Sequence, residues 1–197
     1  MAKKRLTFLI LFSISLVISA NVVAQSYVPV IADTKMKQKP VPLIKAWSYQ
    51  LSQVKLLNSP FRHAMKMDSA YLLLIKPDRL LYRFHKHAGL PVKDSIYGGW
   101  EQDGISGHTL GHYLSACALM YTSTGNPEFK KRVEYIVQEL RRCQVARKSG
   151  YVGAVPNEDT IFAQVKRGDI RTGGFDLNGG WVPWYTLHKV LGGLLDA

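Results

Sequence analysis

Cysteine is scarce: the 197-residue chain contains only Cys117 and Cys143, far apart in the sequence. A structural zinc site usually takes four cysteine or histidine ligands, so this pair excludes a zinc finger or ribbon. A disulfide between the two is also disfavoured. If they lie on antiparallel helices joined near Thr124, they differ by about 18 Å along the helix axis, whereas bridged Cα atoms lie within roughly 7 Å. We therefore expect two buried free thiols.

Acidic residues are also few, since 14 Asp and Glu stand against 26 Lys and Arg and give a formal net charge of +12. An excess of positive charge invites a nucleic-acid partner. The basic residues are dispersed, however, and the chain has no run of five of them and no zinc-finger or RNA-binding aromatic motif. We therefore expect no nucleic-acid partner, and a neutral or acidic polysaccharide is the better match.

Long apolar runs are absent except near the N-terminus, where the basic residues 3–5 precede an apolar stretch over residues 6–17. This stretch is short for a membrane span, because serines interrupt it and follow it. Small residues follow at the spacing of a signal-peptidase site. We interpret residues 1–24 as a secretory signal peptide cleaved after Ala24, which lowers the net charge by three, to +9. The mature protein would then be periplasmic or extracellular, with no membrane span.

Strand patterns are scarce, whereas apolar residues recur at helical spacing through residues 58–197. Residues 25–57 form a polar, proline-containing leader, in which a short alternation at Val54 and Leu56 suits either a strand or a docking segment. Glycine-rich stretches near residues 97–104 and over residues 168–180 predict loops. Helices are expected, with their starts and stops read from capping residues, Pro and Gly, over residues 59–75, 78–89, 106–122, 127–144, 157–166 and 182–197.

The two central helices should form an antiparallel hairpin. Gly125 ends a turn, Asn126 is a good capping residue, and Pro127 suits the first helical position. An apolar seam at helical spacing follows in the second helix, at Phe129, Val133, Ile136, Leu140 and Cys143. The corresponding stripe of the first helix is Leu110, Leu114, Cys117 and Tyr121.

The last helix has no stop signal before Ala197, and the sequence contains no further helix that could cover its apolar residues. We therefore interpret residues 58–197 as the N-terminal part of a larger, truncated helical domain. The inward face of this helix is expected to carry Trp184, Leu187, His188, Leu191, Leu194 and Leu195.

The stretch from Tyr97 to Met120 has the character of a site. A glycine-rich loop displays Trp100 and Glu101, and the helix that follows carries His108 and His112 on one face. The spacing of the two histidines suits zinc, but Thr109 follows the first one where a zinc protease has Glu. We favour polar lining of a sugar pocket over a metal site, and a purely structural role for both histidines stays open.

Glu101 is also a candidate glycosidase carboxylate. Glycoside hydrolysis needs two carboxyl groups across the scissile bond. Asp103 is too close in sequence to face Glu101 across a sugar, and Asp176 has no supporting motif. We therefore expect Glu101 to form hydrogen bonds or to fix its loop. Three aromatic residues shortly before His188 suit a stacking platform or core packing equally, namely Trp181, Trp184 and Tyr185.

Several blocks in this order resemble the N-terminal part of the β-L-arabinofuranosidase group, glycoside hydrolase families 127 and 146, formerly a domain of unknown function. The resemblance covers roughly residues 50–197. The blocks are Pro77-Asp-Arg-Leu-Leu, Ala88-Gly-Leu-Pro, Tyr97-Gly-Gly-Trp-Glu, Ser106-Gly-His-Thr-Leu-Gly-His-Tyr-Leu-Ser-Ala, Gly150-Tyr-Val-Gly and Trp181-Val-Pro-Trp-Tyr-Thr-Leu-His-Lys-Val-Leu.

The resemblance implies an all-α fold, here the N-terminal portion of an (α/α)6 barrel that is incomplete in this chain. It implies release of terminal β-L-arabinofuranose from plant-type glycans with retention of configuration. It also implies a zinc-bound cysteine nucleophile and a glutamate acid/base in the full-length enzyme, with zinc ligands outside this chain. No catalytic residue and no metal ligand are therefore expected here. A substrate-binding role is implied for His188, His108, Trp100, Glu101 and His112.

Two alternatives stay open. The chain could be a non-catalytic, sugar-binding helical module, or part of another six-hairpin glycosidase or lyase that uses paired acids without zinc. A glutamate and a cluster of cysteines further along the chain would decide for the β-L-arabinofuranosidase.

Overall fold

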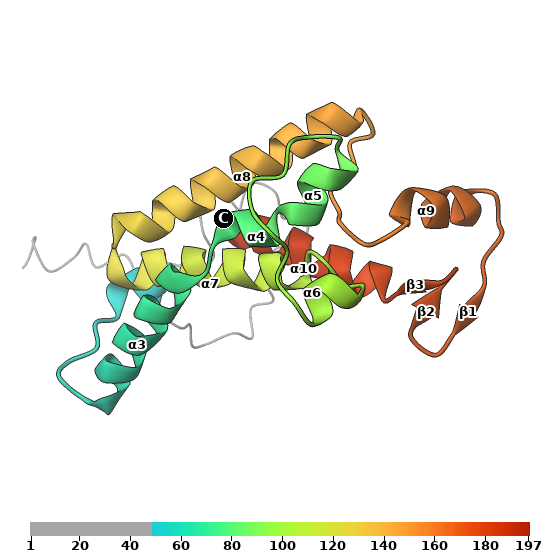
Figure 1. Ribbon diagram of the computed structural model, residues 1–197. Helices are drawn as coiled ribbons and strands as arrows, with labels where there is room; N and C mark the ends of the chain where they lie inside the picture. The colour runs from blue at the N-terminus through green and yellow to red at the C-terminus, as the bar shows by residue number, and fades with distance from the viewer. Residues whose placement is uncertain (1–48) are drawn as a thin grey trace, which may run out of the picture. The chain divides into compact units, whose positions relative to one another are not determined.

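Helices account for most of residues 49–197, the part of the chain that the computed structural model describes. Residues Leu51 to Ala197 cluster as one unit, with eight α-helices and three short β-strands (Figure 1). The proposed signal peptide, and the leader up to residue 48, lie outside the described residues. Within residues 49–197, no helix has the length and the apolar character that crossing a bilayer requires.

The predicted hairpin is present as α7 (His108–Thr124) and α8 (Pro127–Arg147). Gly125 ends α7 with a positive φ of 69°, a conformation that glycine adopts readily. The Asn126 side chain then accepts a hydrogen bond from the backbone N–H of Glu128 at 3.0 Å. Pro127 is the first residue of α8, so the predicted roles of Asn126 and Pro127 are confirmed. The first helix runs two residues beyond its predicted end at residue 122, since Ser123 and Thr124 belong to α7.

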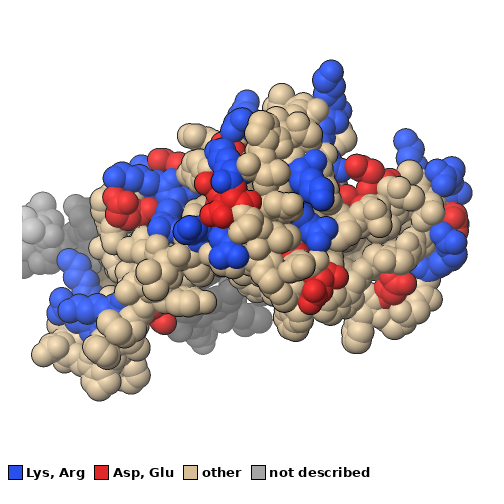
Figure 2. Space-filling model, in the orientation of Figure 1, with Lys and Arg blue, Asp and Glu red and all other residues tan. Residues whose placement is uncertain are grey.

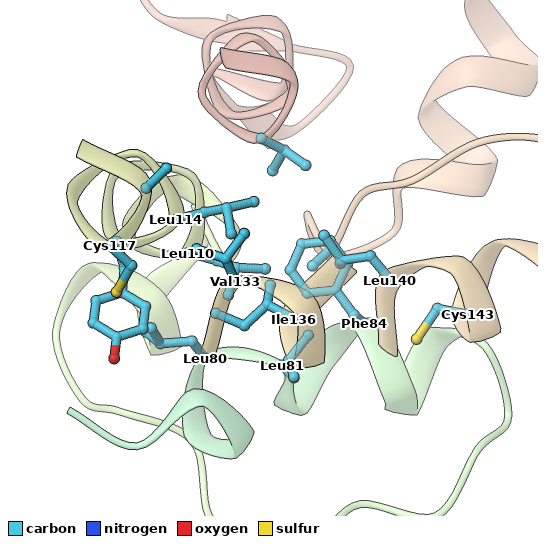
Figure 3. Packing of buried hydrophobic residues seen from close by; sticks show 14 of the residues in the cluster. Leu80, Leu81, Phe84, Leu110, Leu114, Cys117, Val133, Ile136, Leu140 and Cys143 are labelled. Carbon is cyan, nitrogen blue, oxygen red and sulfur yellow. The ribbon is translucent and has the colours of Figure 1, made fainter. Parts of the chain in front are cut away.

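The main core lies between this hairpin and two short helices, α4 (Pro77–Leu80) and α5 (Tyr82–His87) (Figure 3). All five predicted seam residues of α8 are buried. On α7 the predicted stripe ends one turn early, because Tyr121 is 37 % exposed. The two cysteines are free and buried, as predicted, and lie at opposite sides of the cluster in Figure 3.

The segment before the core begins with a short 3-10 helix, η2 (Leu51–Gln53), followed by α3 (Pro60–Leu74). The alternation at residues 54–57 forms no strand. Ser59 caps α3 as predicted, since its hydroxyl accepts from the N–H of Arg62 at 3.3 Å. The helix predicted over residues 78–89 forms as two short helices, α4 and α5, and begins one residue earlier, at Pro77, where the fixed φ of proline suits a helix start.

Arg132 of α8 donates hydrogen bonds to the carbonyl groups at the C-terminus of α3. Its guanidinium donates to the carbonyl of Ile75 at 2.5 Å and to that of Leu73 at 2.7 Å. The last carbonyls of a helix have no partner within the helix, so a side-chain donor stabilises them. The end of α3 is thereby tied to the hairpin.

The last helix, α10 (Pro183–Asp196), packs along α7 (Figure 1). The two backbones touch through glycines. A Cβ on Gly111 would lie 2.2 Å from the carbonyl oxygen of Lys189, and a Cβ on Gly193 would lie 2.4 Å from that of Gly111. No side chain fits between these positions.

This contact corrects the predicted inward face of α10. The residues facing α7 are Thr186, Val190 and Gly193, all buried, whereas Trp184, His188, Leu191 and Leu195 are exposed. The spacing of apolar residues alone predicted that the larger side chains of α10 face inward. The helices instead approach where the residues are smallest, which turns α10 away from the predicted orientation.

Two predicted loops contain regular structure. A short helix, α6 (Trp100–Asp103), lies in the first glycine-rich stretch. The second stretch follows the predicted helix α9 (Glu158–Lys166). The second stretch forms an antiparallel sheet in the order β1-β2-β3. Asn178 and Gly179 join the last two strands with φ values of 51° and 83°, the two-residue hairpin that an Asn-Gly pair favours. The strands are β1 (Thr172–Gly173), β2 (Asp176–Leu177) and β3 (Gly180–Trp181).

The prediction of a mostly helical chain is confirmed, with this small sheet as the exception. Residues 49–197 do not display a barrel, and the (α/α)6 architecture stays a prediction.

Candidate functional site

Glu101 fixes the loop that leads into α7. Its carboxylate accepts hydrogen bonds from the backbone N–H of Thr109 at 2.9 Å and of Gly107 at 3.2 Å. The hydroxyl of Ser106 donates to the Glu101 carbonyl. Since the residue before α7 is Gly107, which has no side chain to cap the helix, Glu101 caps it from a neighbouring helical turn. The loop-fixing role expected for Glu101 is therefore what its contacts show.

The environment of Glu101 leaves little of its carboxylate for other partners. The residue is 4 % exposed. Burial raises the pKa of Glu101, and the N–H donors of Thr109 and Gly107 and the charge of Arg83 oppose that rise. Each carboxylate oxygen already accepts a hydrogen bond. This arrangement suits a structural carboxylate better than one of two acids facing across a glycosidic bond.

Five rings from α6, α7, β3 and α10 form what we name the ring cluster: Trp100, His108, His112, Trp181 and Tyr185. The His108 ring stacks on Tyr185 with centroids 5.3 Å apart, and it is nearly perpendicular to the His112 ring, with centroids 4.7 Å apart. The ring centroids of Trp100 and His108 lie 5.8 Å apart. The glycine contact between α7 and α10 brings these rings within reach of one another.

The surroundings of His108 favour its neutral form. Burial lowers its pKa below the ordinary 6.5, and the nearby charges of His112 and Lys189 lower it further. A neutral imidazole offers one hydrogen-bond donor and one acceptor. The Nδ1 atom of His108 is buried and has no hydrogen-bond partner among residues 49–197. Such unpaired buried atoms are uncommon in folded proteins.

The structure brings together three of the five predicted site residues, Trp100, His108 and His112. Glu101 lies beside them, with its carboxylate turned to the backbone of the loop. His188 is exposed and makes none of the ring contacts of the cluster. It follows Tyr185 by three residues on α10, so the two side chains are neighbours on the helix surface.

Trp181 and Tyr185 extend the site beyond the five residues to which the sequence assigned a substrate-binding role. They are 40 % and 42 % exposed, and Trp184 is 55 % exposed. None of these three rings lies in the core that residues 49–197 form. The aromatic spacing before His188 carried this signal, but it fitted core packing equally well. Exposure is what a stacking platform requires.

Trp100 also lines a pocket of about 360 Å³. Its wall includes Tyr97, whose hydroxyl accepts from the N–H of Lys76 at 3.0 Å and whose ring lies 3.9 Å from the guanidinium carbon of Arg79. These contacts hold the wall in place without a ligand. The size suits a sugar ring. The lining residues are Tyr71, Leu74, Ile75, Leu80, Tyr97, Gly98, Trp100, Glu101 and Thr109.

Residues 49–197 do not fit a zinc site. No group of three or more His, Cys, Asp or Glu side chains within them is placed to hold a metal ion. His108 and His112 are a pair without a third ligand, because Glu101 is bonded to the backbone. Burial also raises the pKa of the Cys117 thiol, and that of Cys143 to about 11, which opposes the thiolate form that zinc requires.

A mostly helical domain with exposed tryptophan, tyrosine and histidine rings beside a pocket defines a candidate carbohydrate-binding protein. Residues 53–197 match the family described as beta-L-arabinofuranosidase, GH127 catalytic domain. The chain therefore belongs to this family of glycoside hydrolases, which confirms the resemblance seen in its sequence. A comparison with curated proteins finds no match.

Proposed function

We propose that the protein is an exported glycoside hydrolase that releases terminal β-L-arabinofuranose from plant-type glycans with retention of configuration. Its family supports a carbohydrate substrate. The observation that carries the proposal is the ring cluster, in which neutral His108 lies between exposed aromatic rings.

The ring cluster can contact both the apolar C–H face and the hydroxyl groups of a sugar. The C–H face of a furanose packs on an aromatic ring such as Trp100, which is 60 % exposed. A sugar hydroxyl both donates and accepts, as does the neutral imidazole of His108. His112 and His188 are exposed and would supply further polar contacts beside it. These residues would bind and orient the sugar, while Glu101 keeps the loop beneath them fixed.

The surface charges agree with a neutral glycan as partner. On the face shown in Figure 2, basic side chains are interspersed with acidic ones and form no continuous stripe. Phosphate recognition along a nucleic acid depends on such a stripe. We therefore propose no nucleic-acid partner. The zinc ion and cysteine nucleophile stay part of the proposal on the family resemblance alone.

The first test is an assay of the full-length protein on 4-nitrophenyl β-L-arabinofuranoside, with the α-L-anomer as control. We expect selective hydrolysis of the β-anomer, and NMR of the first product should show β-L-arabinofuranose. A non-catalytic sugar-binding module is the second candidate, because the ring cluster is a binding device that needs no acid. Binding of the glycoside without turnover would favour it. Hydrolysis of another sugar, or inversion, would contradict the proposed activity.

Export is tested separately. N-terminal sequencing of the protein recovered outside the cytoplasm of the expressing cell should begin at Gln25, the residue after the proposed cleavage point. An intact N-terminus on a protein retained in the cytoplasm would contradict it.

A further inference from the structure

A second cavity, of about 460 Å³, lies between the α8–α9 connection, α9 and the start of α10. Three aromatic rings in contact form its apolar wall. The Phe162 ring lies 5.3 Å from Tyr151 and 5.0 Å from Trp184 between centroids. We name it the aromatic cavity, and its lining is completed by Ser149, Asp159, Ala163, Lys166 and Leu187.

One wall of the aromatic cavity is fixed by a buried carboxylate. Glu158 is 1 % exposed and accepts hydrogen bonds from the Tyr151 hydroxyl at 3.0 Å and the Val155 N–H at 3.1 Å. It also pairs with Arg147 and lies 3.3 Å from the Nδ1 of His87. Burial, and next the charge of Glu158, raise the pKa of Tyr151, so its hydroxyl stays protonated and donates.

Gly153 shows how closely this wall is packed. A Cβ at that position would lie 2.3 Å from the Tyr151 hydroxyl oxygen and 2.7 Å from Oε2 of Glu158. Only glycine leaves room for the hydrogen bond between the two side chains. The Tyr151 ring is therefore held in position before any ligand arrives, and a preorganised wall lowers the entropy cost of binding.

The chemistry of the aromatic cavity favours a neutral sugar. Its rings offer apolar faces, and its rim carries Lys166, Asp159 and Ser149. The Asp159 carboxylate is 80 % exposed on its side chain and pairs with Arg147, which leaves an oxygen for a hydroxyl. Charges of both signs on one rim give no preference for an acidic or a basic ligand, whereas hydroxyl groups bond to either.

The aromatic cavity and the proposed site share α10. Trp184 lines the cavity, and Tyr185 of the ring cluster is the next residue of the same helix. Trp184 also lies four residues before His188, so the two side chains are neighbours on the helix surface. The helical spacing of Trp184 and His188 is thus the link between the cavity and the residues proposed to bind the released sugar.

We propose that the aromatic cavity binds a second, neutral sugar ring of the glycan, one that is not released, so that the enzyme prefers an oligosaccharide to a simple aryl glycoside. This inference rests on the proposed function, because it assigns a neighbouring subsite to the same substrate. Phe162 on α9 is the residue that tests it, since it contributes a ring to the cavity and none to the ring cluster.

The experiment compares kcat/KM of the full-length enzyme on a β-linked arabinofuranosyl disaccharide and on 4-nitrophenyl β-L-arabinofuranoside. Loss of one stacked ring is worth about 1.4 kcal/mol, which corresponds to a tenfold change. We expect Phe162→Ala to lower kcat/KM about tenfold on the disaccharide and to leave the aryl glycoside unchanged. Phe162→Tyr, which keeps the ring, should restore the preference.

Phe175→Ala is the matched control, because Phe175 is 81 % exposed in the turn between β1 and β2 and does not line the cavity. Equal losses on both substrates, or no loss on either, would overturn the inference. If the wild-type protein cleaves neither substrate, calorimetry with the disaccharide decides. If the disaccharide binds and Phe162→Ala weakens the binding, the cavity is a sugar site and only the proposed activity is wrong. If wild type and Phe162→Ala bind the disaccharide equally, or neither binds it, the cavity is not a sugar site either.

Discussion

The helix α7 has two interfaces of opposite kind. Towards α8 it packs through large apolar side chains, including Leu110, Leu114 and Ile136, all of them buried. Towards α10 it packs backbone against backbone, through Gly111 and Gly193. The first interface fills space with side chains that can adjust by rotation, whereas the second has no side chain to move. The ring cluster is assembled across the second interface, so its geometry depends on the less adaptable contact.

The largest effect expected is therefore that of adding one methyl group at the backbone contact. In Gly111→Ala the new Cβ would lie 2.2 Å from the carbonyl of Lys189, so the two helices must separate. We expect a loss of roughly 3 kcal/mol in the free energy of unfolding, at the upper end for overpacking. Chemical denaturation of the purified protein measures it.

Gly192→Ala is the control for that variant. Gly192 lies in α10 next to Gly193, but nothing stands within 4 Å of its Cβ position. Alanine there should stabilise the helix by about 0.5–1 kcal/mol. Equal destabilisation by both substitutions would show that the backbone contact is not what limits the approach of the helices.

His188→Ala should reduce activity on an arabinofuranoside by about 100-fold, equivalent to about 2.7 kcal/mol in the transition state. His188 is exposed, so the thermal midpoint should not change. The assay is kcat/KM together with a melting curve. A fall in the midpoint that accounts for the lost activity would instead assign His188 a structural role.

Removing one methyl group on the hairpin side should cost far less than adding one on the other side. Ile136 is fully buried in the core, and Ile136→Val leaves only a small void. We expect a loss of about 1 kcal/mol in the free energy of unfolding, measured by the same denaturation. A loss as large as that of Gly111→Ala would remove the distinction between the two interfaces.

The smallest effect concerns pH. The pKa of His108 is lowered in the folded protein, so between that value and the ordinary 6.5 the unfolded chain binds more protons. The free energy of unfolding should therefore rise with pH through the window just below 6.5 and level off above it. His108→Gln should flatten this rise. Denaturation at several pH values checks it, and an unchanged slope in the variant would contradict the assignment.

The hairpin was predictable because its signals are local. Asn126 caps α8 through its own side chain, and the seam from Phe129 to Cys143 repeats at helical spacing. The pairing of His108 with His112 followed from the same periodicity. In each case the interaction lies within one helix or one turn, where sequence spacing fixes geometry.

What the sequence left undetermined involves contacts between distant segments or residues without side chains. The orientation of α10 depends on Gly111, which periodicity treats as neutral. The hydrogen bonds of Arg132 to the end of α3 join residues about sixty positions apart. The Asn178-Gly179 pair did carry the signal of a hairpin turn, but its strands are only two residues long and show no alternation.

The measurement that tests the central claim most directly is NMR of the histidine ring protons during titration with methyl β-L-arabinofuranoside. If the ring cluster binds the sugar, the His108 and His112 signals should shift together and saturate with one dissociation constant, while the exposed His63, on α3, stays unchanged. A ligand that is bound, or hydrolysed, without moving the signals of His108 and His112 would contradict the account.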